Sequence, residues 1–397
     1  MRKHRSDLLL VVLTLILMAL GLLVVFAVGP RVAQFENSQS GSSFSETYFF
    51  KHHLISVVVA IVAMIFGSKV PYKFLDKHSL KIIGAGFFLC ILVFIWGKIG
   101  NPGGLVTCDE GACRAFRMPG TGIGFQPVEI VKVGILFYIS WLIQERKRQR
   151  MMDTRELWIP VGTLILLTGI FVAFGLKDFG STVVIFAMVC AMLFIGGVDL
   201  KQFALGLGAL ALLAGLLILM SPHRRARIAS FGDNYHVENA LISLGTGGLF
   251  GVGIGNSIQA TGYLPEALSD SIIAIIGEVT GFIGAIGVIL LFAMILVRMI
   301  GVSKRTEDNA QALYVVGVAA WIFAHVIINV GGMIGLIPVK GITLPFLSYG
   351  GTSMLFVSFA LGTVLQISSW TKREVVNEDS GSRRGQWRAR NAGHRRS

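Results

Sequence analysis

One long polar stretch of the sequence combines carboxylates with a cluster of arginines. Glu266 and Asp270 stand directly before an apolar segment, and Arg224, Arg225 and Arg227 precede them in the same stretch. A carboxylate within hydrogen-bond reach of a hydroxyl can act as a general base. Arginine guanidinium groups bind phosphate oxygens through paired hydrogen bonds. The stretch therefore predicts a site for a phosphate-bearing ligand with a carboxylate base beside it.

Each part of this prediction has an alternative. An acidic residue directly before an apolar helix, such as Asp270, is also typical of an N-cap, and residue chemistry alone favours neither role. The three arginines could instead mark a helix end whose side chains reach lipid headgroups. We favour a specific anion site because the cluster is tight and, as argued below, lies on the side of the membrane where positive charge is unusual.

Two further charges interrupt an apolar segment. Glu129 and Lys132 are three residues apart, so they can form an ion pair across one helical turn. Charges inside such segments are costly and usually functional. Lys132 lies just after the loop that carries Arg114, so we expect both cations to approach the anionic ligand. For Lys132, the alternative is a purely structural ion pair with Glu129.

The remaining polar residues of the apolar segments predict structural roles. Glu278, His325 and Asn329 are expected to join helices through hydrogen bonds. No cluster of histidine, cysteine and carboxylate has the spacing of a metal site. The sequence indicates no cofactor, although it leaves a divalent cation open.

The elements that position these residues are membrane spans. The chain has 397 residues, of which 54% are hydrophobic and 14% charged, whereas soluble domains carry about 25% charged residues. Runs long enough for a bilayer number about ten, which predicts an all-α polytopic membrane protein. The expected runs are 8–28, 52–70, 80–98, 127–143, 157–174, 181–198, 202–220, 271–299, 310–332 and 349–369.

The loops between these runs predict an orientation. Lysine and arginine gather before the first run, after the second, fourth and eighth, and after the last, so we expect both termini in the cytoplasm. Residues 221–270 then form the largest outer loop within a membrane domain of residues 1–370. Residues 371–397 form a basic disordered tail beside anionic membrane lipids. The net charge of +13 is spread over such loops and the tail, so it does not indicate nucleic-acid binding.

The same orientation places Cys108 and Cys113 outside the membrane. A disulfide can persist there if the compartment is oxidising. Two free thiols in a loop are the alternative.

Six short strings follow one another along the chain. They are Gln126-Pro127-Val128-Glu129 with Lys132, Asp178-Phe179-Gly180-Ser181, Arg224 to Phe231, Gly247 to Gly255, Leu264-Pro265-Glu266-Ala267 with Asp270, and Lys340 to Gly351. In this order they make the chain resemble the SEDS family, the FtsW, RodA and SpoVE group of cell-wall polymerases. The chain departs from the usual family strings at Val128, Lys177, Leu268, Ser269 and Ser271, and a family R-W-I string is replaced by the residues around Arg114.

This resemblance implies polymerisation of lipid II into glycan strands at the outer face of the bacterial cytoplasmic membrane, with undecaprenyl pyrophosphate leaving. The family's proposed catalytic aspartate corresponds to Asp270. We expect the three arginines and Lys132 to stabilise the leaving group, and Glu129 to orient Lys132. The resemblance also implies a class B penicillin-binding protein as a partner. Lys340 with Thr343, and Gly277-Glu278, look more like the FtsW subgroup, which implies a role in cell division with other division proteins as partners.

Two rival functions fit a bundle of this kind. A transporter that flips the lipid-linked precursor would use buried charges and broken helices near the middle of the membrane. A membrane scaffold of the division machinery would need none of the unusual outer residues. The unusual residues gather towards the outer face, and no internal repeat is visible, so the sequence favours the enzyme.

Overall fold

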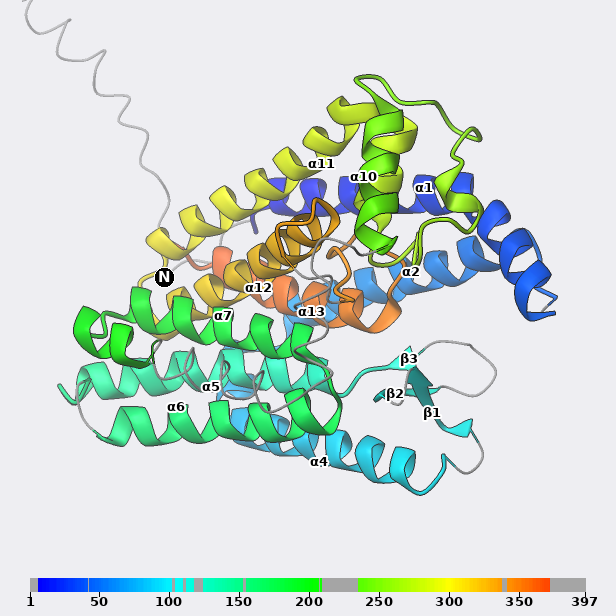
Figure 1. The fold of residues 1–397 in the computed structure, drawn as a ribbon. Helices are drawn as coiled ribbons and strands as arrows, with labels where there is room; N and C mark the ends of the chain where they lie inside the picture. The colour runs from blue at the N-terminus through cyan, green and yellow to red at the C-terminus, as the bar shows by residue number, and fades with distance from the viewer. Residues whose placement is uncertain are drawn as a thin grey trace, which may run out of the picture.

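A computed structural model describes residues 6–41, 43–101, 104–109, 112–117, 124–152, 155–206, 208, 235–337 and 341–371. The described chain is a bundle of long helices with a small β-sheet near one end (Figure 1). Eight of the described helices are long and apolar enough to cross a membrane. The expected fold class, a polytopic helical membrane protein, is confirmed.

Nine of the expected apolar runs coincide with helices, whereas residues 202–220 lie mostly outside the described part. The short helix α3 (Tyr72–Lys77) connects the second and third long helices. The long helices are α1 (Leu8–Ser40), α2 (Tyr48–Lys69), α4 (Ser79–Lys98), α5 (Val128–Arg148), α6 (Arg155–Leu167) with its π-helical continuation Thr168–Gly175, α7 (Phe179–Gly196), α11 (Ile272–Arg305), α12 (Asn309–Met333) and α13 (Gly351–Ser368).

Helix α5, which carries Glu129 and Lys132, packs against α4, α7 and α12. Its residues from Val128 to Ser140 are almost all buried. Close approach to α4 is possible because Gly86 faces Val131 and Gly134 faces Ile83, where a side chain would meet its neighbour at less than 3 Å. Since protein rather than lipid surrounds α5, this helix can carry charged residues inside the bundle.

Helix α1 is longer than expected. The sequence predicted a span of 8–28 followed by a loop, but α1 continues to Ser40. Its 33 residues extend about 50 Å, beyond the roughly 30 Å of a hydrocarbon core. The added turns have a packing role, because Arg31 donates hydrogen bonds to the carbonyls of Gly255 and Ser257 in the loop that precedes α11.

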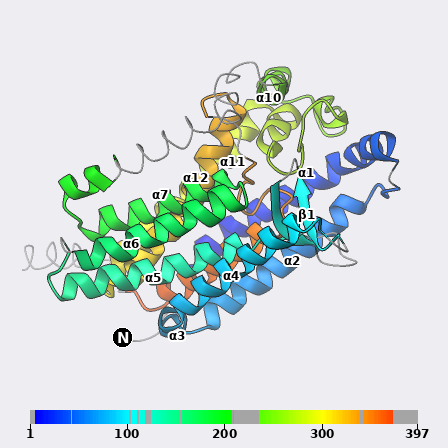
Figure 2. The same cartoon turned by 60° about the horizontal axis from the view of Figure 1, so that its bottom comes forward.

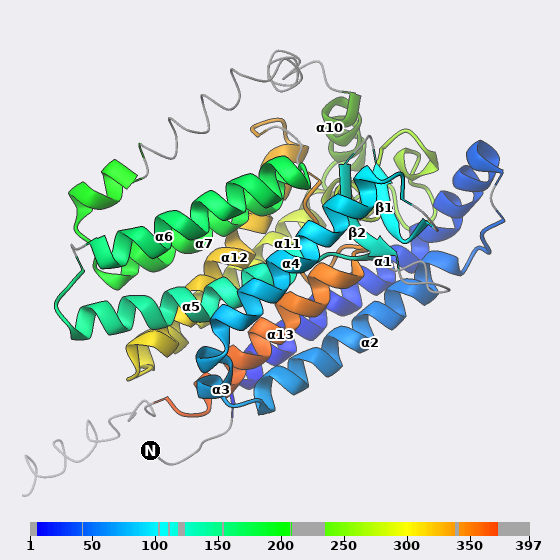
Figure 3. The same ribbon diagram turned by 90° about the horizontal axis from the view of Figure 1, so that it is seen from below.

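Both ends of the described chain lie at the same end of the bundle (Figures 1 and 3). The Asp7 amide donates to the Ser368 hydroxyl at 3.0 Å. The Asp7 carboxylate also accepts a hydrogen bond from Arg298 near the end of α11, at 2.6 Å. This shared end agrees with an even number of crossings; that it faces the cytoplasm stays a prediction.

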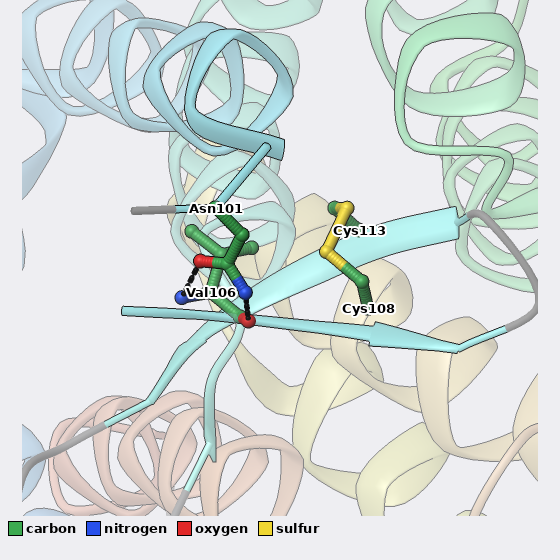
Figure 4. Close-up of a disulfide and its surroundings, with 4 residues drawn as sticks. All are labelled: Asn101, Val106, Cys108 and Cys113. Carbon is green, nitrogen blue, oxygen red and sulfur yellow. Dashed lines mark hydrogen bonds between the residues drawn. A yellow bond between two sulfur atoms is a disulfide. The ribbon is translucent and has the colours of Figure 1, made fainter. Parts of the chain in front are cut away.

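A three-stranded antiparallel sheet, which the sequence did not predict, joins α4 to α5. It contains β1 (Val106–Asp109), β2 (Ala112–Arg117) and β3 (Gly124–Phe125) in that order. Cys108 and Cys113 form a disulfide between β1 and β2 (Figure 4). The Asn101 side chain forms two hydrogen bonds with the Val106 backbone. These contacts hold the hairpin at the end of α4.

Helix α11 is broken within its N-terminal third. Gly281 has φ 74° and ψ −174°, which interrupts the helical backbone. The break leaves backbone amides and carbonyls of α11 without helical partners, and the glycine-rich turn after α10 (Tyr235–Gly247) bonds to them. The amides of Val252 and Gly253 donate to the backbone carbonyls of Glu278 and Val279, and the amides of Phe282 and Ile283 donate to the carbonyls of Gly248 and Leu249. A Cβ on Gly251 would lie 2.2 Å from the Val279 oxygen. The glycine pattern thus serves contact between backbones, as expected for an irregular segment beside a membrane.

The glycine-rich turn after α10 and the β-sheet lie at the end of the bundle away from the N-terminus (Figures 1 and 2). The chain from α10 to α11 and the chain from α4 to α5 therefore reach the same end. This arrangement brings the residues of several distant segments together.

Candidate functional site

Asp270 lies in the turn that leads into α11, and its side chain does not cap the helix. The N-cap position belongs to Ser271, and no side-chain capping hydrogen bond is made there. The capping alternative for Asp270 is therefore wrong. Among the described residues, no hydrogen bond reaches the Asp270 carboxylate, which leaves both oxygens available.

Three charged groups surround Asp270. Burial, with smaller contributions from the negative charges of Glu266 and Asp178, raises the pKa of Asp270 to about 7 against the opposing effect of Arg114. A carboxyl with a pKa near the working pH is well suited to accept a proton. The structure thus gives Asp270 the protonation behaviour of a general base.

Backbone contacts fix the turn that carries Asp270. The Asn329 Nδ2 donates to the Asp270 and Ile342 carbonyls, each at 2.6 Å. The Tyr349 amide donates to the Leu268 carbonyl at 2.8 Å. At Gly341, which has φ +64°, an added Cβ would lie 3.2 Å from Asp270 Oδ2. The segment before α13 therefore forms a wall beside the carboxylate.

Arg114 reaches the same site from β2. It donates to the Lys177 carbonyl at 3.2 Å, and its buried Nε has no hydrogen-bond partner among the described residues. The next residue, Asp178, begins α7 by accepting a hydrogen bond from the Ser181 amide at 2.9 Å. The sheet thus brings the Arg114 cation to the start of α7 and within electrostatic reach of Asp270. Sequence order alone could not predict this placement.

Glu129 and Lys132 form the predicted ion pair, with 2.8 Å between Lys132 Nζ and Glu129 Oε1. The Lys132 side chain is only 1% exposed. Its ammonium also lies 5.4 Å from the centre of the Trp321 ring. Lys132 is therefore enclosed between α5 and α12, and its expected contact with a ligand remains a prediction.

Helix α12 presents Trp321, His325 and Asn329 at successive turns. Trp321 Nε1 donates to His325 Nε2 at 3.1 Å. His325 Nδ1 contacts the Thr343 carbonyl at 2.9 Å. Since indole can only donate and a carbonyl can only accept, these two bonds define a neutral His325 with its hydrogen on Nδ1. This polar face links Lys132 to residues 341–343 and to Asp270.

The other predicted residues have different surroundings. Glu278 is 1% exposed and accepts hydrogen bonds from the Ser257 hydroxyl at 2.5 Å and from the amides of Ile258 and Gln259. Glu266 is exposed and accepts a bond from Ser269 Oγ at 2.6 Å. Glu278 thus fixes a turn of the segment between α10 and α11, whereas Glu266 acts on Asp270 through its charge.

Arg224, Arg225 and Arg227 lie outside the described residues, as does nearly all of the 371–397 tail. Within the described part of the chain, no group of three histidine, cysteine or acidic residues could hold a metal ion.

Sequence reasoning did not select Asp178, Trp321 or Gly341 as site residues. Asp178 and Gly341 belong to strings that carried the family resemblance, so those strings were an available signal. Trp321 had none, because an aromatic residue in an apolar helix is usually a packing residue.

Known proteins resemble the chain in sequence and in fold. Residues 7–373 match the FtsW/RodA/SpoVE family, described as cell cycle proteins. A probable peptidoglycan glycosyltransferase FtsW from Coxiella burnetii is 35% identical over 379 residues, covering 91% of this chain and 96% of the relative. Stage V sporulation protein E from Bacillus subtilis is 32% identical over 384 residues, covering 94% and 99%.

Solved structures share the fold at lower identity. A chain of a peptidoglycan synthase complex that coordinates polymerization and crosslinking superimposes with a TM-score of 0.72 at 21% identity, covering 92% of this chain and 99% of that one. The rod shape determining protein RodA of Thermus thermophilus gives a TM-score of 0.65 at 20% identity, covering 93% and 98%. The expected family is confirmed: this chain is a multi-pass membrane protein of the FtsW/RodA/SpoVE family.

Proposed function

We propose that this chain is a peptidoglycan glycosyltransferase of cell division, which polymerises lipid II at the outer face of the cytoplasmic membrane. The observation that carries the proposal is the position of Asp270, whose carboxylate lies beside Gly341 on a turn held by Asn329, within the electrostatic reach of Arg114. A sugar transfer from a pyrophosphate carrier requires both the carboxylate and the cation. The relatives named peptidoglycan glycosyltransferase support the same activity.

In the proposed reaction, Asp270 takes the proton from the 4-hydroxyl of the acceptor sugar. That oxygen forms a bond to the anomeric carbon of the lipid-linked donor, and the bond between this carbon and the pyrophosphate oxygen breaks. The electron pair leaves with undecaprenyl pyrophosphate. Negative charge thus moves from the base side of the site to the leaving group.

Cations must stabilise that leaving group. Arg114 is the described cation that acts on Asp270 electrostatically, and its unpartnered Nε can donate to a phosphate oxygen. We assign the same role to Arg224, Arg225 and Arg227 in the outer loop. Because Lys132 is buried, it stabilises the leaving group through its electrostatic field or after a rearrangement of the helices, with Glu129 orienting its ammonium.

The proposed partners follow from the likeness to division relatives and to a synthase complex. A class B penicillin-binding protein would crosslink the strands, which agrees with a structural neighbour from a complex that coordinates polymerization and crosslinking. Other division proteins, and membrane lipids beside the tail at 371–397, complete the proposed surroundings. Both termini would lie in the cytoplasm.

The test is polymerisation of purified lipid II by the full chain, reconstituted with its penicillin-binding partner. Asp270→Asn is compared with Asp199→Asn, which removes an exposed carboxylate beyond the far end of α7. We expect Asp270→Asn to abolish polymer and Asp199→Asn to retain it, with equal partner binding in both. Polymer from Asp270→Asn at the wild-type rate would exclude Asp270 as the base and make Glu266 the next candidate.

Two further outcomes would point to the rival functions. If the wild-type complex makes no polymer but moves lipid II across vesicle membranes, the protein is a flippase. If it does neither and still binds its partner, a scaffold role fits. Neither result would change the family assignment.

A further inference from the structure

The Asn329 side chain joins two segments that come from distant parts of the chain. Its Nδ2 donates to the carbonyl of Asp270, before α11, and to the carbonyl of Ile342, before α13. Asn329 itself is 3% exposed. Because a primary amide nitrogen carries two hydrogens, one small group serves both carbonyls at once.

The contacts define which way the Asn329 amide faces. Both partners are carbonyl oxygens, so the nitrogen must point at them. Asn329 Oδ1 then points elsewhere and has no hydrogen-bond partner among the described residues. A buried acceptor left without a partner costs about 1–3 kcal/mol. Stability alone is therefore a poor reason for an asparagine at this position.

The Asp270 carboxylate depends on its main chain for its position. Within the described residues no hydrogen bond holds the carboxylate itself, whereas Asn329 holds the carbonyl of the same residue. Gly341, which directly precedes Ile342, allows the carboxylate to lie against the backbone. The Tyr349 amide fixes Leu268, two residues before Asp270. Of these contacts, only the Asn329 amide bridges Asp270 and residues 341–343 directly.

We infer that Asn329 is a positioning residue for the general base, an inference that rests on the proposed function. It holds the main chain of Asp270 against residues 341–343, so that the carboxylate faces the acceptor hydroxyl. Asn329 does not touch the reacting atoms. Its loss therefore lowers turnover more than it weakens substrate binding.

The substitution that isolates this role is Asn329→Asp. It keeps the size of the side chain but replaces the two-hydrogen donor by a carboxylate, which faces two carbonyl oxygens and adds a negative charge beside Asp270. The other ionisable groups near this position are His325, one turn away on α12, and Lys132 on α5. Glu266, Asp178 and Arg114 act on Asp270, and His236 on α10 is hydrogen-bonded to Ser271. Asn256→Asp is the matched control, since Asn256 is exposed and, among the described residues, its side chain donates only to the nearby Val252 carbonyl.

The experiment measures the kcat and KM of polymerisation for both variants in the partner complex. For Asn329→Asp we expect kcat to fall by about 10²-fold, as small misplacements do, with KM nearly unchanged and Asn256→Asp equal to wild type. As the pH is lowered, the ratio of variant to wild-type activity should rise, because a protonated carboxyl regains one donor. A purely structural defect would not recover in acid. An unchanged kcat, or a loss confined to KM, would overturn the inference.

Hydrogen exchange gives a second measurement that needs no activity. Replacing Asn329 by alanine should speed amide exchange in residues 264–271 and 341–349, while α2 and α7 keep wild-type exchange. Unchanged exchange in those two segments would refute the inference even if polymerisation were lost. If the wild type makes no polymer, the proposed function fails, and the exchange result still decides whether Asn329 holds Asp270.

Discussion

The ammonium of Lys132 lies between the carboxylate of Glu129, at 2.8 Å, and the face of Trp321, at 5.4 Å from the ring centre. Two helices thus share one buried cation. The ion pair comes from α5 and the aromatic ring from α12, so the charge is neutralised within one helix and shielded by another. This relationship couples the stability of the bundle to the electrostatics of the site.

The first prediction concerns that ion pair. Lys132→Met leaves the Glu129 carboxylate buried without its partner, and we expect a loss of about 3–5 kcal/mol in the free energy of unfolding. The double variant Glu129→Gln with Lys132→Met removes both charges and should recover most of that loss. Thermal unfolding in lipid nanodiscs measures both.

The comparison also separates stability from activity. The double variant should unfold at a temperature close to that of wild type yet make little polymer, because the cation is gone. If the double variant were as unstable as Lys132→Met, the cost would come from packing around the lysine and not from the unpaired charge.

The second prediction follows from the raised pKa of Asp270. Because a general base must be deprotonated, polymerisation should increase with pH and reach half its maximum near the pKa of about 7. Arg114 lowers this pKa, so Arg114→Gln should move the midpoint to higher pH as well as reduce the maximal rate. The test is the pH dependence of kcat/KM for lipid II, which reports the pKa of the free enzyme. A pH-independent rate between 5 and 9 would refute it.

The third prediction is the stability counterpart of the second. The folded state binds the Asp270 proton more tightly than the unfolded state, whose pKa is near 3.8. Folding stability from this group is therefore complete at low pH and is lost as the pH rises from 3.8 towards about 7. Asp270→Asn should consequently be more stable than wild type above pH 7, by on the order of a few kcal/mol. Unfolding curves at pH 5 and pH 8 should show the difference at pH 8 mainly.

The sequence predicted the parts of this protein that depend on local composition. Long apolar runs are sufficient to define membrane helices, and Glu129 with Lys132 is recognisable because the two charges interrupt such a run at helical spacing. Asp270 was selected by the string that precedes it. The extension of α1 to Ser40 was missed because the polar residues after Phe35 are typical of a loop. The helix is extended by contacts that the sequence does not show, such as those of Arg31 with the segment before α11.

Other features depend on contacts that no local pattern contains. Trp321 resembles any packing residue of an apolar helix until Lys132 is placed over its ring. Asn329 was predicted to join helices, but its partners are the carbonyls of Asp270 and Ile342, which become neighbours only when the segments before α11 and α13 meet. The short strands around Cys108 and Cys113 are similarly fixed by their pairing and by the end of α4.

The last prediction concerns the broken turn of α11. At Gly251 an alanine Cβ would lie 2.2 Å from the Val279 oxygen, and the residue has φ +83°, so Gly251→Ala must separate the glycine-rich turn from α11 or strain both. Gly245→Ala is the matched control, because nothing lies within 4 Å of a Cβ at that helical position. We expect Gly251→Ala to lower the unfolding free energy by about 2 kcal/mol or more and Gly245→Ala to leave it equal or slightly higher.

The same pair of variants tests whether the turn supports the site. Asp270 precedes α11 by two residues, and the N-terminal part of that helix is held through Glu278, Val279 and Gly281. Loosening the turn should therefore reduce polymerisation even at temperatures where Gly251→Ala remains folded. If Gly251→Ala were as stable as wild type, the turn and α11 would not be in contact. The backbone hydrogen bonds described between them would then be wrong.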